Sequence, residues 1–270
     1  MKHTSFSGKL VILGFGSIAK GVLPLILRHI DMPKDRMEII TSDLRDVEIA
    51  KTLGIRHTVL PLTRDNYAAE LSTRLSAGDF LLNLSVDVSS VALVKLCREL
   101  GALYLDTCVE PWAGGYTDPA LSPSQRSNYA LRESALALKN QAGPTAVMTH
   151  GANPGLVSHF VKQALLNLAQ DLGIPADVPT TRAAWARLAH DLGIKVIHIA
   201  ERDTQVAGNM PKRRGEFVNT WSIDGFTGEG CQPAELGWGS HEKTLPADGE
   251  RHSFGCDAAI YLMRPGAATR

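Results

Sequence analysis

The residues of this sequence best suited to chemistry are acidic side chains close to an aromatic ring. Glu110 precedes a proline and a tryptophan in a glycine-rich stretch, and Glu201 follows an apolar run. Glu229 and Glu235 come shortly after Trp221. Carboxylates beside an aromatic face suit a dicationic amine, through charge pairing and cation–π contact. For any one glutamate ordinary surface charge is the simpler interpretation, and a single tryptophan is more often part of a core.

A glycine-rich turn is the second chemical signal. The segment Gly14-Phe15-Gly16-Ser17-Ile18-Ala19 directly follows an apolar run and begins a helical pattern. In this context Gly14 permits a tight turn, Gly16 lets a pyrophosphate approach the backbone, and Ala19 permits close helix packing. A tight turn without a ligand is the competing interpretation. We predict a dinucleotide site whose phosphate-binding residues are Gly14, Gly16, Ser17 and Ile18.

The ribose of such a dinucleotide is expected to meet an acidic side chain at the end of the second strand. Thr41, Ser42 and Asp43 occupy that turn. We assign the ribose contact to Asp43, with Thr41 as the competitor. The acidic side chain favours NAD, and Arg45 keeps NADP as the alternative cofactor.

Other polar residues end the later strands of the predicted sheet. Asn83, Ser85 and Asp87 follow one apolar run, and Asp106 and Thr107 end the next. Ligands of open α/β sheets bind at the carboxyl ends of the strands, so these positions favour contact with a cofactor or substrate. Helix caps and turns are the competing roles, and for Asp87 a turn is an equally good interpretation. The cofactor contacts predicted here are Asn83, Ser85, Asp106 and Thr107.

Asn153 and Pro154 lie between the last apolar run of this region and a helical pattern. The Asn153 amide suits a hydrogen bond to a nicotinamide or a ribose. Asn153 also suits a helix N-cap, with Pro154 at the first helical position. The two roles are compatible, and we include both residues in the predicted cofactor site.

Short apolar runs alternate with amphipathic stretches between residues 9 and 148, which is typical of parallel strands joined by crossover helices. Because these runs lack polar alternation, helices should cover both faces of the sheet. We predict an α/β fold whose doubly wound Rossmann sheet occupies residues 1–152. The expected strands are 9–13, 37–41, 56–60, 80–84, 103–107 and 145–149. Pro24 should kink or end the first crossover helix.

A second, α+β domain is predicted over residues 153–270, for substrate binding and dimerisation. Its first helices are expected at 156–168 and 181–192. Two segments, 195–204 and 217–226, are expected to be extended, and Trp221 alternates onto one face of the second. The residues from Ala258 onward are typical of a strand that runs into a loop.

Composition excludes several classes of partner. Lys and Arg together number 28, as do Asp and Glu, so no net charge attracts nucleic acid or an anionic membrane. No apolar run approaches the roughly 20 residues that cross a bilayer. The four cysteines form no CxxC pair and the first residues lack a secretion signal, which favours reduced thiols in the cytoplasm. No metal site is predicted.

Several long segments of the sequence point to one family. They are NLSVDVSS, GALYLDTCVEPWAGGY, RSNYALRESAL, GANPGLVSHFVKQAL, GIKVIHIAERDTQ, VNTWSIDGF and QPAELGWGSHEK. Together they closely resemble the bacterial homospermidine synthases, relatives of the saccharopine dehydrogenases, and the resemblance runs from about residue 9 to the end. It implies an NAD-dependent aminobutyl transfer between two putrescines, or from spermidine to putrescine, that gives sym-homospermidine without net redox change. From two putrescines the other product is ammonia.

The resemblance also implies roles for single residues. Glu110, Glu201 and Glu229 would anchor the diamine or carry protons, Trp221 would guide the cation, and Asn153 would lie near the nicotinamide. A homodimer is implied as well. The family's chains are substantially longer, so the second domain is expected to be incomplete. The rival functions are a saccharopine dehydrogenase-like oxidoreductase with net cofactor turnover and an inactive NAD-binding fragment.

Overall fold

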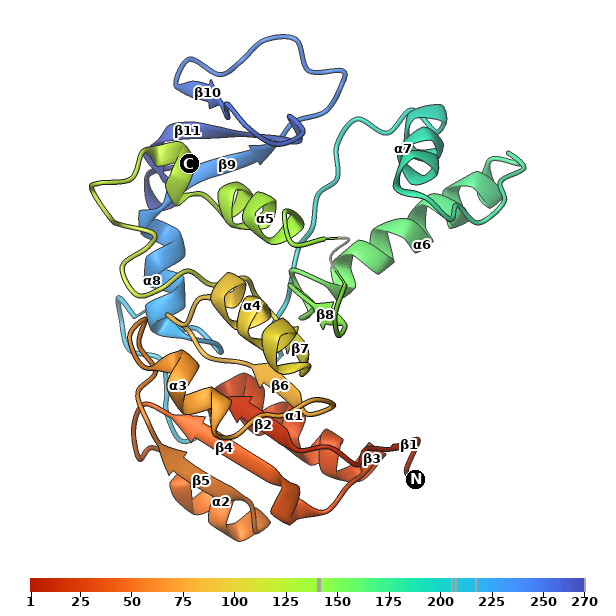
Figure 1. Ribbon diagram of the computed structural model, residues 1–270. Coiled ribbons are helices and arrows are strands. Elements are labelled where there is room, and N and C mark those ends of the chain that lie inside the picture. The colour runs from red at the N-terminus through yellow and green to blue at the C-terminus, as the bar shows by residue number, and fades with distance from the viewer. Residues whose placement is uncertain (140–141, 205, 207, 217, 270) are drawn as a thin grey trace.

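The computed structural model describes residues 1–139, 142–204, 206, 208–216 and 218–269. Its centre is a sheet of six parallel strands (Figure 1). The strands are β2 (Leu10–Leu13), β4 (Met37–Thr41), β5 (Arg56–Val59), β6 (Phe80–Asn83), β7 (Leu103–Asp106) and β8 (Ala146–Val147). Their order across the sheet is β5-β4-β2-β6-β7-β8, which is the order of a Rossmann fold. The predicted sheet is confirmed, with the last strand shorter than expected.

Helices cover both faces of this sheet, as the apolar runs require. On one face α1 (Ser17–His29) and α2 (Val47–Leu53) pack with buried side chains such as Ile12 and Ile39. On the other face α3 (Tyr67–Ser72) and α4 (Ser90–Leu100) pack with Val11 and Leu81. The central strands β2, β4 and β6 therefore bury both of their faces, which explains why their sequences show no polar alternation, whereas the edge strands β5 and β8 stay partly exposed.

Proline 24 does not end the first crossover helix. Helix α1 runs from Ser17 to His29 with Pro24 in its interior, so an end of the helix at Pro24 is wrong, and a kink there stays a prediction. Buried Ala19 and Leu23 before the proline, and partly buried Ile26 and Leu27 after it, hold both halves of the helix against the sheet. Packing of this face outweighs the loss of one amide donor.

The rest of the chain adds a helical hairpin and a small sheet. Helices α6 (Leu156–Asp171) and α7 (Arg182–Asp191) share a small core of their own and project from the body (Figure 1). An antiparallel sheet has the order β10-β11-β9. Its strands are β9 (Pro233–Gly237), β10 (Gly249–Arg251) and β11 (Ala259–Pro265). Helix α5 (Asn128–Leu136) packs beside α4, and η2 (Pro123–Arg126) beside β9 and β11.

Short elements complete the described chain. Strands β1 (Thr4–Ser5) and β3 (Ile30–Asp31) pair in parallel near the N-terminus. Two further 3-10 turns are η1 (Lys34–Arg36) and η3 (Gly266–Ala268). Within the described residues, no helix has the length and apolar character to cross a membrane. The domain boundary at residue 152 stays a prediction.

The two extended segments predicted for the second domain are not strands. Among the described residues, 195–204 contains neither helix nor strand, and helix α8 (Ile223–Cys231) replaces the second half of the other segment. Ser222 caps α8 by accepting the Gly225 N–H at 3.0 Å. This local cap outweighs the weak alternation that suggested a strand. Phe217, part of that prediction, lies outside the described residues.

Candidate functional site

The glycine turn lies at the topological switch point of the sheet, where β2 pairs with both β4 and β6. Gly14 has φ +83°, and a Cβ there would lie 2.7 Å from the carbonyl oxygen of Leu84. Only glycine fits this turn. Gly16, the N-cap of α1, has nothing within 4 Å of a Cβ position, and the first amides of α1 carry no side-chain cap. Open space at exposed amides of a helix start suits a phosphate.

Asp43, the predicted ribose contact, lies just after β4 and is held by Arg45. The Arg45 backbone N–H donates to Oδ1 of Asp43 at 2.8 Å, and its guanidinium contacts Oδ2 at 2.7 Å. These hydrogen bonds lower the pKa of Asp43, so the carboxylate is ionised. The Thr41 hydroxyl donates its proton to the Asp43 carbonyl at 2.7 Å, so this proton is already used in a hydrogen bond within the turn. This arrangement favours Asp43 over Thr41 as the ribose acceptor.

The side chains of Asn83 and Asp106 are buried and form hydrogen bonds within the protein interior. Asn83 is 2% exposed and Asp106 fully buried, and both bond the Tyr104 hydroxyl between them. Ser85 donates to Oδ1 of Asn83 at 2.6 Å. Thr107 is half-buried beside Gly151. Hydrogen bonds among Asn83, Ser85, Tyr104 and Asp106 therefore stabilise the carboxyl ends of β6 and β7. Contact of the predicted residues with a cofactor stays a prediction.

The turn at 151–155 differs from the predicted helix cap. The N-cap of α6 is Gly155, not Asn153, and it makes no side-chain cap bond. A Cβ at Gly155 would lie 2.4 Å from the Gly151 oxygen, so the turn requires glycine. Pro154 precedes the helix and its carbonyl accepts the Gly151 N–H at 2.9 Å. The helix-cap interpretation is wrong, and the exposed side chain of Asn153 leaves its amide accessible.

Glu110 and Glu229 form the acidic part of the site. Glu110 follows β7 and is 9% exposed, and Glu229 lies on α8. Burial, followed by the neighbouring charges of Asp87 and Glu229, raises the pKa of Glu110 to about 8. Glu229 is exposed, and partial desolvation raises its pKa. Residues 119 positions apart in the chain thus share one acidic cluster.

Asp87 belongs to the same cluster, although the predicted site omitted it. Asp87 is exposed, but partial desolvation and the charge of Asp224 raise its pKa. Among the neighbouring charges, that of Asp87 raises the pKa of Glu110 most. Cys108 lies there too, since burial and the charges of Glu110 and Glu229 raise its pKa to about 12. The position of Asp87 just beyond a strand end was the signal that could have included it.

Other predicted residues lie in different surroundings. Trp221 precedes α8 and packs against Phe226, with ring centroids 5.9 Å apart, and its side chain is 39% exposed. Glu201 is exposed in a segment without helix or strand and is not among the charges that raise the pKa of Glu110. Glu235 has a structural role, because its carboxylate accepts the N–H groups of Asn128 and Tyr129 at the start of α5.

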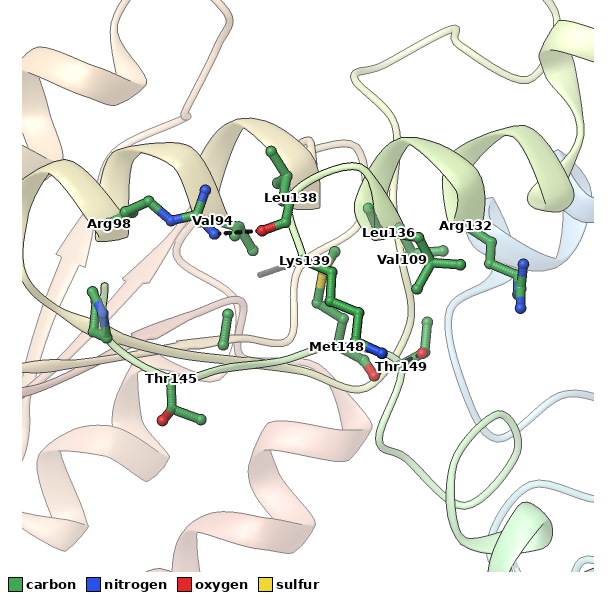
Figure 2. A pocket seen from close by; sticks show the side chains of 13 residues that line it. Val94, Arg98, Val109, Arg132, Leu136, Leu138, Lys139, Thr145, Met148 and Thr149 are labelled. Carbon is green, nitrogen blue, oxygen red and sulfur yellow. Dashed lines mark hydrogen bonds between the residues drawn. The ribbon is translucent and has the colours of Figure 1, made fainter. Parts of the chain in front are cut away.

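A cavity of about 500 Å³ lies between α4, α5 and β8, and Val109, the neighbour of Glu110 in sequence, is part of its lining. Figure 2 shows apolar side chains and the long side chains of Arg98, Arg132 and Lys139 around it. All its charged lining groups are basic. Like charges repel a diamine, so the acidic cluster is the better candidate for one.

Comparison with known families agrees with this architecture. The sequence profile of the saccharopine dehydrogenase NADP binding domain matches residues 10–148, more than half of the chain. The chain belongs to the saccharopine dehydrogenase family. The profile of the saccharopine dehydrogenase C-terminal domain matches residues 151–269 of this family member.

Within the saccharopine dehydrogenase family, the chain is similar to homospermidine synthases. That of Blastochloris viridis is 54% identical over 268 residues, which cover 97% of this chain and 56% of the relative. That of Mesorhizobium japonicum is 49% identical over 275 residues, covering 99% and 56%. The chain spans about half the length of the curated relatives it matches. The resemblance inferred from the motifs is confirmed.

A solved structure is similar over the same region. The crystal structure of the homospermidine synthase from Legionella pneumophila, in complex with NAD, matches with a TM-score of 0.84 and 44% identity. The match covers 98% of this chain and 55% of that one. The Rossmann sheet and the following region are therefore shared with an NAD-bound relative.

Proposed function

We propose that this chain carries the NAD site and part of the diamine site of a homospermidine synthase. The observation that carries the proposal is the acidic cluster of Glu110, Glu229 and Asp87 at the carboxyl edge of a Rossmann sheet. Such a cluster suits a dication and repels a carboxylate. Similarity to three homospermidine synthases supports the same substrate class.

The open glycine turn fits a dinucleotide. Gly14, Gly16 and the first amides of α1 would hold the pyrophosphate, and Asp43 would accept the ribose hydroxyls. An ionised Asp43 favours NAD over NADP, because a 2′-phosphate would meet its negative charge. Bound NAD would supply a hydride acceptor that later returns the hydride. Asn153 would lie near the nicotinamide.

The acidic residues would bind and deprotonate the diamine. Only a neutral amine can lose a hydride from its carbon or attack an imine carbon, so a base must take the ammonium proton. Glu110, with a pKa near 8, is suited to exchange a proton near neutral pH. Glu229 and Asp87 would hold the ammonium groups, and Glu201 remains a proposed further anchor. Trp221 would offer its ring face to the cation.

Products separate this function from its rivals. The purified chain is incubated with putrescine and NAD, and homospermidine, ammonia and NADH are measured. Homospermidine and ammonia without net NADH support the synthase. Net NADH would instead indicate a saccharopine dehydrogenase-like oxidoreductase, and no product an inactive NAD-binding fragment.

Binding tests the diamine site without turnover. Calorimetry should show putrescine binding that weakens in Glu110→Gln, whereas lysine, whose carboxylate meets like charges, should not bind. Trp221→Leu should weaken putrescine binding by about 1 to 2 kcal/mol. Glu99→Gln, on the exposed side of α4, is the matched control and should leave the affinity unchanged. Tight lysine binding, or equal putrescine affinity in every variant, would contradict the proposal.

The proposal includes a cytoplasmic homodimer. Apolar side chains on α6, such as Phe160 at 63% exposed, provide surface for self-association. Light scattering during size-exclusion chromatography measures the mass in solution. A mass of a single chain at all concentrations would contradict the dimer.

A further inference from the structure

A network of buried, hydrogen-bonded polar side chains contacts the loop that carries Glu110. Asn83 ends β6, Tyr104 and Asp106 lie on β7, and Ser90 begins α4. All four are at most 2% exposed. Nδ2 of Asn83 donates to the Tyr104 hydroxyl at 3.2 Å, and that hydroxyl donates to Oδ2 of Asp106 at 2.8 Å.

Ser90 joins these groups to Glu110. Its Oγ accepts the Glu110 N–H at 3.0 Å, and its own N–H donates to the Glu110 carbonyl at 2.9 Å. The Glu110 backbone is therefore held on both sides by one residue. Because Ser90 is fully buried, its hydroxyl proton needs an acceptor. The Asp106 carboxylate and the Tyr104 hydroxyl lie beside it and interact with it.

Asp106 is itself fixed from a third strand. Its Oδ1 accepts the backbone N–H of Thr149 at 2.5 Å, just beyond β8. Both carboxylate oxygens are thus bonded within the protein. One hydrogen-bond network therefore links the ends of β6, β7 and β8 to the start of α4. This network gives the Glu110 loop a rigid base.

We propose that Ser90 is a positioning residue for Glu110, and that Tyr104 and Asp106 hold the Ser90 hydroxyl in place. The inference rests on the proposed function, since the place of Glu110 matters to a reaction only if the acidic cluster binds the diamine. Physically, the backbone position of Glu110 decides how deeply its carboxyl is buried and how close it lies to Asp87 and Glu229. Both factors set its proton affinity.

Three variants test this arrangement in the full 270-residue chain. Ser90→Ala removes the acceptor for the Glu110 N–H, and Ser90→Thr keeps a hydroxyl. Tyr104→Phe removes the hydroxyl between Asn83 and Asp106. The matched control is Ser89→Ala, which removes the cap bond from the Ala92 N–H to Ser89 at the same helix end.

The readout is the titration of the Glu110 carboxyl, followed by carbon-13 NMR without ligand and assigned by its disappearance in Glu110→Gln. The wild-type titration midpoint of Glu110 should lie near 8. Ser90→Ala and Tyr104→Phe should lower this midpoint towards the ordinary value of a glutamate, by on the order of one unit or more. Ser90→Thr and Ser89→Ala should resemble the wild type.

A folded Ser90→Ala with the wild-type midpoint overturns the inference, and so does an equal shift in Ser89→Ala. If Ser90→Ala does not fold, Tyr104→Phe decides by the same criterion.

Putrescine calorimetry separates this inference from the function it rests on. A lowered midpoint with affinity weakened on the order of tenfold in Ser90→Ala supports both. A lowered midpoint with unchanged affinity supports the positioning role of Ser90 and contradicts the diamine site.

Discussion

Glu110 makes the free energy of unfolding depend on pH. Burial and neighbouring carboxylates raise its folded-state pKa from 4.5 to about 8. A raised pKa means that the contribution of Glu110 to stability is fully present below about pH 4.5 and is lost as pH rises through 8. We expect Glu110→Gln to match the wild type near pH 4.5 and to exceed it at pH 9, by on the order of 3 kcal/mol.

Urea unfolding at several pH values measures this difference. Glu99→Gln, which neutralises an exposed glutamate, should show no such pH dependence. A constant difference between Glu110→Gln and the wild type from pH 4.5 to 9 would contradict a buried, proton-binding Glu110.

Gly16 offers a test of the dinucleotide site that leaves the fold intact. A side chain at Gly16 meets nothing within 4 Å in the protein, so Gly16→Val should fold. It should lose NAD binding, because the valine fills the space that the pyrophosphate needs. Gly21→Val is the control, since it places the same side chain in open space further along α1. Thermal shift with NAD compares the variants, and an NAD response retained in Gly16→Val would exclude this turn as the phosphate site.

At the scale of elements, Pro24 shows how packing overrides local preference. Its missing N–H leaves a gap in the hydrogen bonds of α1, and its side chain is exposed, so it contributes little packing. Pro24→Ala should therefore raise the free energy of unfolding by about 1 to 3 kcal/mol. Urea unfolding measures the gain, and Pro33→Ala, outside the helix, should show none of comparable size. An equally stable or weaker Pro24→Ala would mean that the helix needs the proline.

The elements that the sequence predicts well are those whose signal is local. Buried strands appear as short apolar runs, and the glycine turn appears as a fixed spacing after one of them. Helix α8 was missed because three glycines in Ile223–Cys231 obscure its period. Glu235 was grouped with the carboxylates that suit a diamine, because nothing local reveals that its carboxylate holds the start of α5, more than 100 residues earlier.

At the scale of the whole molecule, the candidate site joins two separately recognised regions. Glu110 lies in the region that matches the NADP binding domain, and Glu229 in the region that matches the C-terminal domain. The sequence alone could bring Glu110 and Glu229 together only through the family resemblance. Their proximity arises when the chain folds, and no local pattern in the sequence reveals it. The chain spans about half the length of its curated relatives, and these two regions together build the acidic cluster.

Residues 208–216, between α7 and α8, are exposed, and this exposure leaves the backbone open to cleavage. Lys212, Arg213 and Arg214 lie there without helix or strand, so trypsin should cut at this point. The pieces should stay together as a two-chain complex, because Glu235 bonds the α5 amides and Ser124 contacts His252 at 2.7 Å across the cut. Nicked protein should elute as one peak in size exclusion yet give two bands on a denaturing gel. After unfolding, recovery should depend on protein concentration, as it does when two molecules must meet, and separation of the pieces under native conditions would contradict this expectation.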